Sequence, residues 1–299
     1  MSENVSGGKT SLTAVGAATF RAAHLALDDH PRVFEDQFAM PFSGAPGSLE
    51  EYARTVSARF IARLGPQAGP TVFRYLRALT VMRNRYAEDE FRSAMERGLT
   101  RYVILGAGLD SFAYRRLDLA ESVQVFEVDH PATQTWKNER LLQLGLHHPS
   151  NLISLPLNLK EHSLTDALRA GGYGLEEPAF VSWLGVTQYL PQDAVFRILQ
   201  EVALLAVGTE IVFTYIVPRV ALDGEDQSLL DLFSTSTKER GEPWMTSLET
   251  AALIRTLQEM GFSDIQNLAP EEANTRYFAD RNETLRVPGL EHVMCARVP

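Results

Sequence analysis

Cysteine is nearly absent from this sequence, since Cys295 is the only one in 299 residues. A single cysteine cannot form an intrachain disulfide, and this usage is typical of proteins from a reducing cytosol. A lone cysteine can also act as a nucleophile, but Cys295 lies in the apolar run HVMCARV. This setting favours a small buried hydrophobic side chain. We therefore expect a cytoplasmic protein without disulfides.

Long hydrophobic runs are also missing, because no stretch approaches the 18 apolar residues of a membrane span. The N-terminal segment MSENVSGGKTSLTAVGAA has no basic start followed by an apolar core, so it is not typical of a signal peptide. Positive charge is in deficit, with 28 Lys and Arg against 38 Asp and Glu. An acidic chain argues against nucleic acid as a partner. No His, Cys and Asp spacing indicates a metal site.

The first third of the chain shows helical periodicity and no convincing strand. Residues 1–10 are small and polar, and we expect them to be disordered. Apolar residues recur at three-to-four spacing after residue 11, and the Pro and Gly cluster PFSGAPG at 41–47 marks a loop. We expect residues 11–98 to form a helical extension with helices over Thr13–Leu27, Leu49–Leu64 and Pro70–Gly98.

From Arg101 onward, short apolar runs alternate with helical stretches. Near-continuous apolar strands that alternate with helices predict a parallel sheet covered on both faces, hence a doubly wound α/β fold in residues 99–299. The predicted strands are Tyr102–Leu105, Val123–Val128, Leu152–Leu155, Ala179–Trp183 and Glu210–Val217, and the helices are near Ser111–Ala120, Pro131–Leu146, Ser163–Ala170 and Pro191–Val207.

The alternation of strands and helices stops at residues 218–245, which are mostly polar and carry scattered aromatic side chains. Connections of this length are often lids or binding loops. A helix over Ser247–Met260 follows and ends at Gly261, which suits a C-cap. Two late strands, Phe262–Leu268 and His292–Val298, have no evident helical crossover between them, so they predict an antiparallel hairpin at the far half of the sheet.

The first strand leads into a glycine turn with Gly106 and Gly108. In open α/β sheets, ligands bind at the carboxyl ends of the strands, and glycine lets the backbone approach a ligand closely. A dinucleotide fingerprint has a third glycine at position 111, where this chain has Ser111. That glycine serves packing beneath a bound pyrophosphate, so a ligand without phosphate, such as S-adenosylmethionine, does not need it. The alternative interpretation is a tight turn without a ligand.

Two further strand ends carry polar residues. Asp129 follows the second strand about 20 residues after the glycines, where a carboxylate can accept both ribose hydroxyls. Its alternative role is an N-cap for the helix that begins at Pro131. Asn158 and Leu159 follow the third strand and can contact an adenine ring, although asparagine also favours turns.

The fourth strand runs into WLGVTQYLP, residues 183–191. Its end is expected to face the reacting group of a bound ligand. Tyr189 is a candidate contact on the acceptor side, since an aromatic face can favour a cation. For Trp183 and Tyr189 the alternative is ordinary core packing.

Together RYVILGAGLDSFAYRR, FEVDHP and WLGVTQYLP resemble the leucine carboxyl methyltransferase family, in particular its bacterial branch of S-adenosylmethionine-dependent O-methyltransferases. The segments RNRYAEDEF at 83–91 and RYFADR at 276–281 are also similar to the family. The resemblance runs from about Ala14 to the C-terminus. It implies a Rossmann-like class I methyltransferase sheet with a helical N-terminal extension over the cofactor.

The resemblance also implies S-adenosyl-L-methionine as cofactor and a role for several residues. Gly106 and Gly108 would form the cofactor loop, and Asp129 would hold the ribose. Arg83 or Arg85 would hold the methionine carboxylate, with Arg85 favoured because a guanidinium binds a carboxylate in bidentate fashion; on a helix, both can also be a solvated face. The family commonly has an acid where Asn158 stands and often has Glu where Leu184 stands, so the acceptor does not carry over.

These features predict methyl transfer from a sulfonium to a carboxylate or hydroxyl of a small molecule, with positioning as the main source of catalysis. No histidine stands out as a general base, so we assign no catalytic residue. Two other functions stay open. One is a cofactor-binding pseudoenzyme, which the missing acid at Leu184 suggests. The other is a nicotinamide-dependent oxidoreductase, against which Ser111 argues. The oligomeric state is not readable from the sequence.

Overall fold

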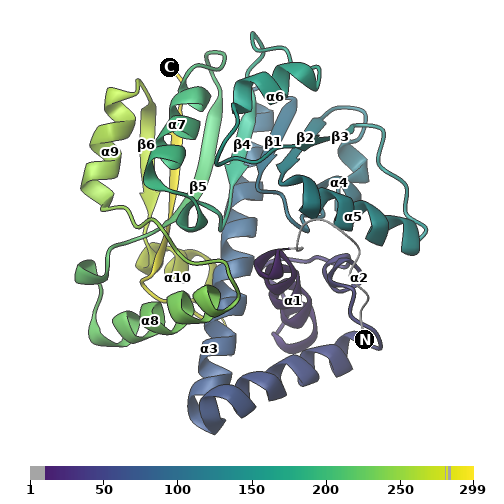
Figure 1. Cartoon of the computed structure of the whole chain (residues 1–299), viewed down its shortest axis with the longest axis vertical. Coiled ribbons are helices and arrows are strands. Elements are labelled where there is room, and N and C mark those ends of the chain that lie inside the picture. Colours follow the sequence, from purple (N-terminus) through teal and green to yellow (C-terminus); the bar gives the residue numbers. More distant parts are fainter. Residues whose placement is uncertain (1–10, 280, 282–283) are drawn as a thin grey trace.

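The computed structural model describes residues 11–279, 281 and 284–299. The predicted disorder of residues 1–10 therefore lies outside the described residues. The chain forms a seven-stranded sheet in the order β3-β2-β1-β4-β5-β7-β6 (Figure 1). The strands are β1 (Arg101–Leu105), β2 (Gln124–Asp129), β3 (Leu152–Pro156), β4 (Phe180–Trp183), β5 (Glu210–Ile216), β6 (Ser263–Leu268) and β7 (Glu291–Arg297).

Strands β1 to β5 pair in parallel, which confirms the predicted sheet. Every residue of β4 and of β5 is buried, as expected for strands covered on both faces. The strand order reverses between β1 and β4, so the crevice at their carboxyl ends is the expected ligand site of the sheet.

Helices cover both faces of the sheet in a three-layer arrangement. In α7, the buried residues Val195, Ile198, Leu199 and Val202 follow the spacing of one helix face, which packs on the sheet. The predicted helix at Ser111–Ala120 is shorter than expected and divides into two short pieces. The helices of this half are α4 (Phe112–Arg115), η1 (Leu117–Leu119), α5 (Pro131–Gln143), α6 (Leu164–Ala170), η2 (Thr187–Tyr189), α7 (Gln192–Ala203) and α9 (Thr250–Glu259).

The N-terminal extension consists of α1 (Leu12–Leu27), α2 (Ala39–Ser43) and α3 (Leu49–Glu96). A capping box between Ser48 and Glu51 starts α3. The range of α3 contains two helices that meet at a kink at Gly65, where φ is 86° and ψ is 170°, which agrees with the two helices expected on either side of this position. Figure 1 shows the second half of α3 running along the sheet, and α1 below the carboxyl ends of the strands. No helix among the described residues has the length and hydropathy needed to cross a membrane.

The C-terminal half departs from the sequence prediction in its connections. Strands β6 and β7 are antiparallel as expected, but β7 inserts between β5 and β6. The connection between them contains α10 (Pro270–Phe278), so the predicted connection without a helix is wrong. Its buried Ala273 and Phe278 pack on the sheet. Residues 218–245 contain η3 (Arg219–Ala221) and α8 (Gly224–Glu239), which lies beside α3 in Figure 1.

Candidate functional site

The glycine turn after β1 is held tightly against β2. The amides of Gly106 and Ala107 both donate to Val128 O, at 2.8 and 3.2 Å. Gly106 has a φ of +64°, and a Cβ added there would lie 2.4 Å from Val186 Cγ2. Only glycine fits this conformation and this contact without a shift of the surrounding chain. The loop therefore presents bare backbone at the carboxyl end of β1.

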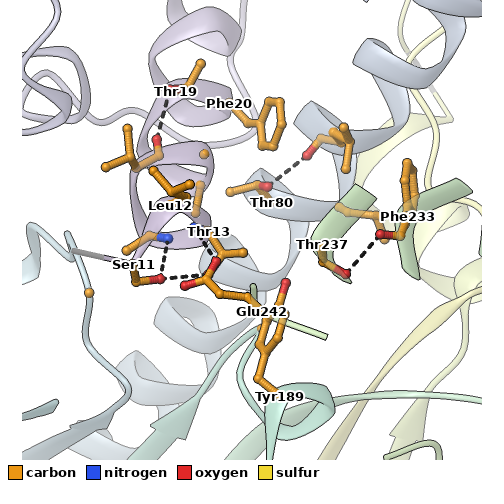
Figure 2. Close-up of a pocket in the computed structure, with 18 of the residues that line it drawn as sticks. Ser11, Leu12, Thr13, Thr19, Phe20, Thr80, Tyr189, Phe233, Thr237 and Glu242 are labelled. Carbon is orange, nitrogen blue, oxygen red and sulfur yellow. Dashed lines mark hydrogen bonds between the residues drawn. The ribbon is translucent and has the colours of Figure 1, made fainter. Parts of the chain in front are cut away.

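A cavity of about 810 Å³ opens above this turn. It lies between the carboxyl ends of β1, β2 and β4 on one side and α1, α3 and α8 on the other (Figure 2). Its volume falls within the range of about 300–1,000 Å³ that is usual for small-molecule sites. Its lining includes six of the residues singled out from the sequence, namely Arg83, Gly106, Gly108, Asp129, Leu184 and Tyr189.

Asp129 joins the glycine turn to the end of β2. Its Oδ2 accepts from the amide of Gly108, and its Oδ1 accepts from the amide of His130 at 2.5 Å. Burial raises the pKa of Asp129, while the two backbone hydrogen bonds oppose that shift. The N-cap of α5 is His130 and not Asp129. The carboxylate thus lines the cavity with lone pairs left to accept from further hydroxyls.

The two arginines of the RNR segment lie on different faces of α3. Arg83 lines the cavity, and its Nη1 lies 3.2 Å from Oε2 of Glu291 on β7. Its Nε is buried and has no hydrogen-bond partner. Arg85, favoured from the sequence, does not line the cavity and pairs with Asp89 at 2.9 Å. The position at the cavity therefore favours Arg83 over Arg85 as the candidate for the methionine carboxylate, because residues two apart on a helix point in different directions.

The loop after β3 meets the cavity through Lys160, whereas Asn158 and Leu159 are not part of its lining. The Asn158 side chain accepts from the amide of Lys160 at 3.1 Å, which is the turn role considered as its alternative. Leu159 is 7% exposed and packs in the core with α6 and α7. The predicted adenine contacts of Asn158 and Leu159 stay predictions.

The two aromatic residues near the end of β4 lie in different places, Trp183 in the core and Tyr189 at the cavity. Trp183 is fully buried and packs in the core. Leu184, Val186 and Tyr189 line the cavity, and Figure 2 shows the Tyr189 ring rising into it toward Glu242. Burial raises the pKa of the Tyr189 hydroxyl, which therefore stays protonated near neutral pH.

Several residues of the site were missed from the sequence. Arg21 of α1 donates to Leu109 O in the glycine turn at 2.6 Å and pairs with Asp36 at 2.7 Å. Beneath the turn, Lys137 donates to Asp110 O at 2.7 Å and pairs with Glu127 at 2.6 Å. These contacts fix the turn from both sides. No motif identified them, because each joins segments far apart in the chain.

One hydrogen bond joins the two segments that cover the cavity, the start of α1 and the segment after α8. The amide of Thr13, at the start of α1, donates to Glu242 Oε2 at 3.0 Å (Figure 2). Glu242 follows α8 in the predicted lid segment, so the helical extension and the lid segment meet over the cavity.

Known proteins similar to this chain are methyltransferases. The family model for leucine carboxyl methyltransferase matches residues 14–203. The chain is 30% identical over 213 residues to the provisionally named S-adenosyl-L-methionine-dependent methyltransferase YktD of Bacillus subtilis, across 68% of this chain and 67% of that protein. A Mycobacterium tuberculosis protein with the same provisional description is 36% identical over 194 residues, 64% of this chain and 60% of that protein.

Two solved structures share the fold at low sequence identity. A provisionally named methyltransferase from Thermobifida fusca YX superposes with a TM-score of 0.58 at 16% identity, over 94% of this chain and 93% of that one. A protein from Streptomyces avermitilis gives 0.55 at 15% identity, over 95% and 97%. The chain therefore belongs to the leucine carboxyl methyltransferase family and is a methyltransferase that depends on S-adenosyl-L-methionine.

Proposed function

We propose that this protein transfers the methyl group of S-adenosyl-L-methionine to an oxygen atom of a small molecule, and that a carboxylate is the acceptor. The observation that carries the proposal is that Arg83 and the glycine turn face the same cavity. Both line one cavity, which continues past Leu184 and Tyr189 under α1 and α8. One part of the cavity thus suits the cofactor, and the remainder is left for an acceptor.

The chain's own residues fit the cofactor. The buried, unpartnered Nε of Arg83 and its Nη atoms suit the methionine carboxylate, because a guanidinium donates to both carboxylate oxygens. Asp129 suits the ribose hydroxyls, since it lines the cavity next to the amide of Gly108. The loop that carries Asn158 and Leu159 stays the proposed adenine contact, and it reaches the cavity wall through Lys160.

When bound, the cofactor supplies a methyl group on a sulfonium, so that a C–O bond to the acceptor forms as the S–C bond breaks. A carboxylate is already an anion and loses no proton in this step, whereas a hydroxyl benefits from a general base. No histidine is found among the described residues that line the cavity. Leu184 and Val186 cover the end of β4 with apolar surface and exclude water from this region.

Two alternatives differ from this proposal in their ligands or their chemistry. Calorimetric titration with S-adenosylhomocysteine and with NADH separates the methyltransferase from a nicotinamide-dependent oxidoreductase. Transfer of a labelled methyl group to a panel of carboxylic acids, phenols and alcohols separates an enzyme from a cofactor-binding pseudoenzyme. The proposal expects binding of S-adenosylhomocysteine and methyl esters as products. Labelled ethers without any ester would assign a hydroxyl acceptor instead.

The ribose contact is tested with Asp129→Ala. A hydrogen bond to a charged group contributes about 1.5–3 kcal/mol, so we expect affinity for S-adenosylhomocysteine to fall roughly tenfold or more. Asp166→Ala is the control, because Asp166 is an exposed residue of α6 away from the cavity lining. Equal affinities of both variants would contradict the assignment of Asp129.

A further inference from the structure

The cavity has an apolar portion away from the glycine turn. We call the residues Phe20, Val56, Phe60, Leu76, Leu232 and Phe233 the apolar chamber; they come from α1, α3 and α8 and all line the cavity. Figure 2 shows Phe20 and Phe233 facing the same space from opposite sides. None of these side chains carries a polar atom.

The chamber lies between two separate clusters of buried apolar residues. Val56 and Phe73 belong to one cluster of buried residues, and Leu229 and Phe233 belong to another. Phe60 packs against both, with its ring 5.0 Å from that of Phe73. Apolar surface left open between two cores favours an apolar occupant over water.

The threonines around the chamber offer it no hydrogen-bond donor. Thr19, Thr80 and Thr237 line the cavity, and each hydroxyl donates to a carbonyl of its own helix, at 2.8, 2.8 and 3.0 Å (Figure 2). These internal bonds occupy the hydroxyl hydrogens. Tyr52, Arg59 and Arg63 of α3 also line the cavity, but the Tyr52 hydroxyl bonds to Thr19 Oγ1 at 2.6 Å and both arginines are exposed. The buried part of this wall therefore stays apolar, and a polar group buried there would be unpaired at a cost.

Unsatisfied polar atoms occur at the edge of the chamber, where the Trp244 ring lies 6.4 Å from that of Phe233. Trp244 Nε1 is buried and makes no well-formed hydrogen bond, although it lies close enough to the Tyr189 hydroxyl to lower the pKa of that group. Gln188 Oε1 is also buried and unpartnered. Both residues line the cavity, and Gln188 is only 4% exposed. Buried polar atoms of this kind are rare and call for a partner. An oxygen of a ligand would accept from Trp244, and the Gln188 amide can turn its NH₂ group toward the same ligand.

From these two features we propose that the methyl acceptor is an amphiphile, with a carboxylate head near Trp244 and Gln188 and a hydrocarbon body in the apolar chamber. The proposal rests on the proposed function and adds the class of substrate. The carboxylate head is the atom group that receives the methyl, while the body is held by burial alone. The chamber therefore selects for the length of an apolar chain.

The experiment measures binding of straight-chain carboxylic acids from acetate to dodecanoate to the full chain with saturating S-adenosylhomocysteine. We expect the affinity to rise about fourfold for each added CH₂ until the chamber is full, and methyl ester yields to follow the same order. An affinity that does not change with chain length would overturn the proposal. If S-adenosylhomocysteine itself fails to bind, the proposed function fails instead.

Matched variants separate the body from the head. Leu232→Gln places a polar group in the chamber, and Leu230→Gln is its control, because Leu230 packs on the same helix but does not line the cavity. We expect only Leu232→Gln to weaken the dependence on chain length. Trp244→Phe removes the indole N–H, so every acid should bind several-fold more weakly with the chain-length dependence unchanged. A chain-length dependence that survives Leu232→Gln and falls with Leu230→Gln would place the body elsewhere and contradict the proposal.

Discussion

Arg83 and Glu291 form an ion pair that joins α3 to the start of β7 at the cavity wall, with Nη1 3.2 Å from Oε2. Glu291 is 4% exposed, so the pair is largely removed from water. The guanidinium also lies against Gly185, where an added Cβ would come within 2.5 Å of Nη1. Arg83 is thus held at the edge of the site by a carboxylate on one side and by bare backbone on the other.

Arg83→Met should weaken the binding of S-adenosylhomocysteine by roughly tenfold to a hundredfold, since a hydrogen bond to a charged group contributes about 1.5–3 kcal/mol. Arg85→Met is the matched control, because Arg85 is two residues away and pairs with Asp89 outside the cavity lining. Calorimetric titration of both variants measures the difference. Loss of affinity in Arg85→Met alone would restore the assignment favoured from the sequence.

Glu291 should make cofactor binding depend on pH. Burial raises the pKa of Glu291, against the opposing effect of Arg83, so its proton is taken up at a higher pH than in a free glutamate. When pH falls toward that raised pKa, Glu291 becomes neutral. Arg83 then has no charged carboxylate beside it that competes with the methionine carboxylate of the cofactor. We therefore expect the affinity for S-adenosylhomocysteine to rise as pH falls from 8 toward 5. Glu291→Gln should remove this dependence; an identical pH profile in wild type and variant would exclude Glu291 as its source.

Gly106→Ala should lower both stability and cofactor affinity. Gly145 has nearly the same φ, +65° against +64°, but a Cβ there meets nothing within 4 Å. Backbone strain of about 1–2 kcal/mol is therefore common to both variants, and the contact with Val186 is specific to Gly106. We expect thermal unfolding to show the larger loss for Gly106→Ala, and titration to show weaker cofactor binding for this variant alone. Normal binding by Gly106→Ala would mean that the turn tolerates a side chain.

The parallel half of the fold was readable because its signals are local. The apolar runs of β1, β2, β4 and β5 are mostly buried on both faces, so they are near-continuous in the sequence and stand out from the helices. The C-terminal half was less readable. The helix α10 carries few apolar residues, and the insertion of β7 between β5 and β6 is a pairing choice that no local pattern encodes.

The sequence alone determined the glycine turn, the acid at the end of β2 and the family, because these depend on residue types at short spacing around Gly106 and Asp129. Tertiary structure decided which arginine meets the cavity, since the orientation of α3 on the sheet turns Arg83 inward and leaves Arg85 partly in solvent. It also brought Glu291 and Trp244 to the same cavity from segments distant in the chain. Contacts of this kind depend on how the packed elements meet, and no spacing in the sequence contains that information.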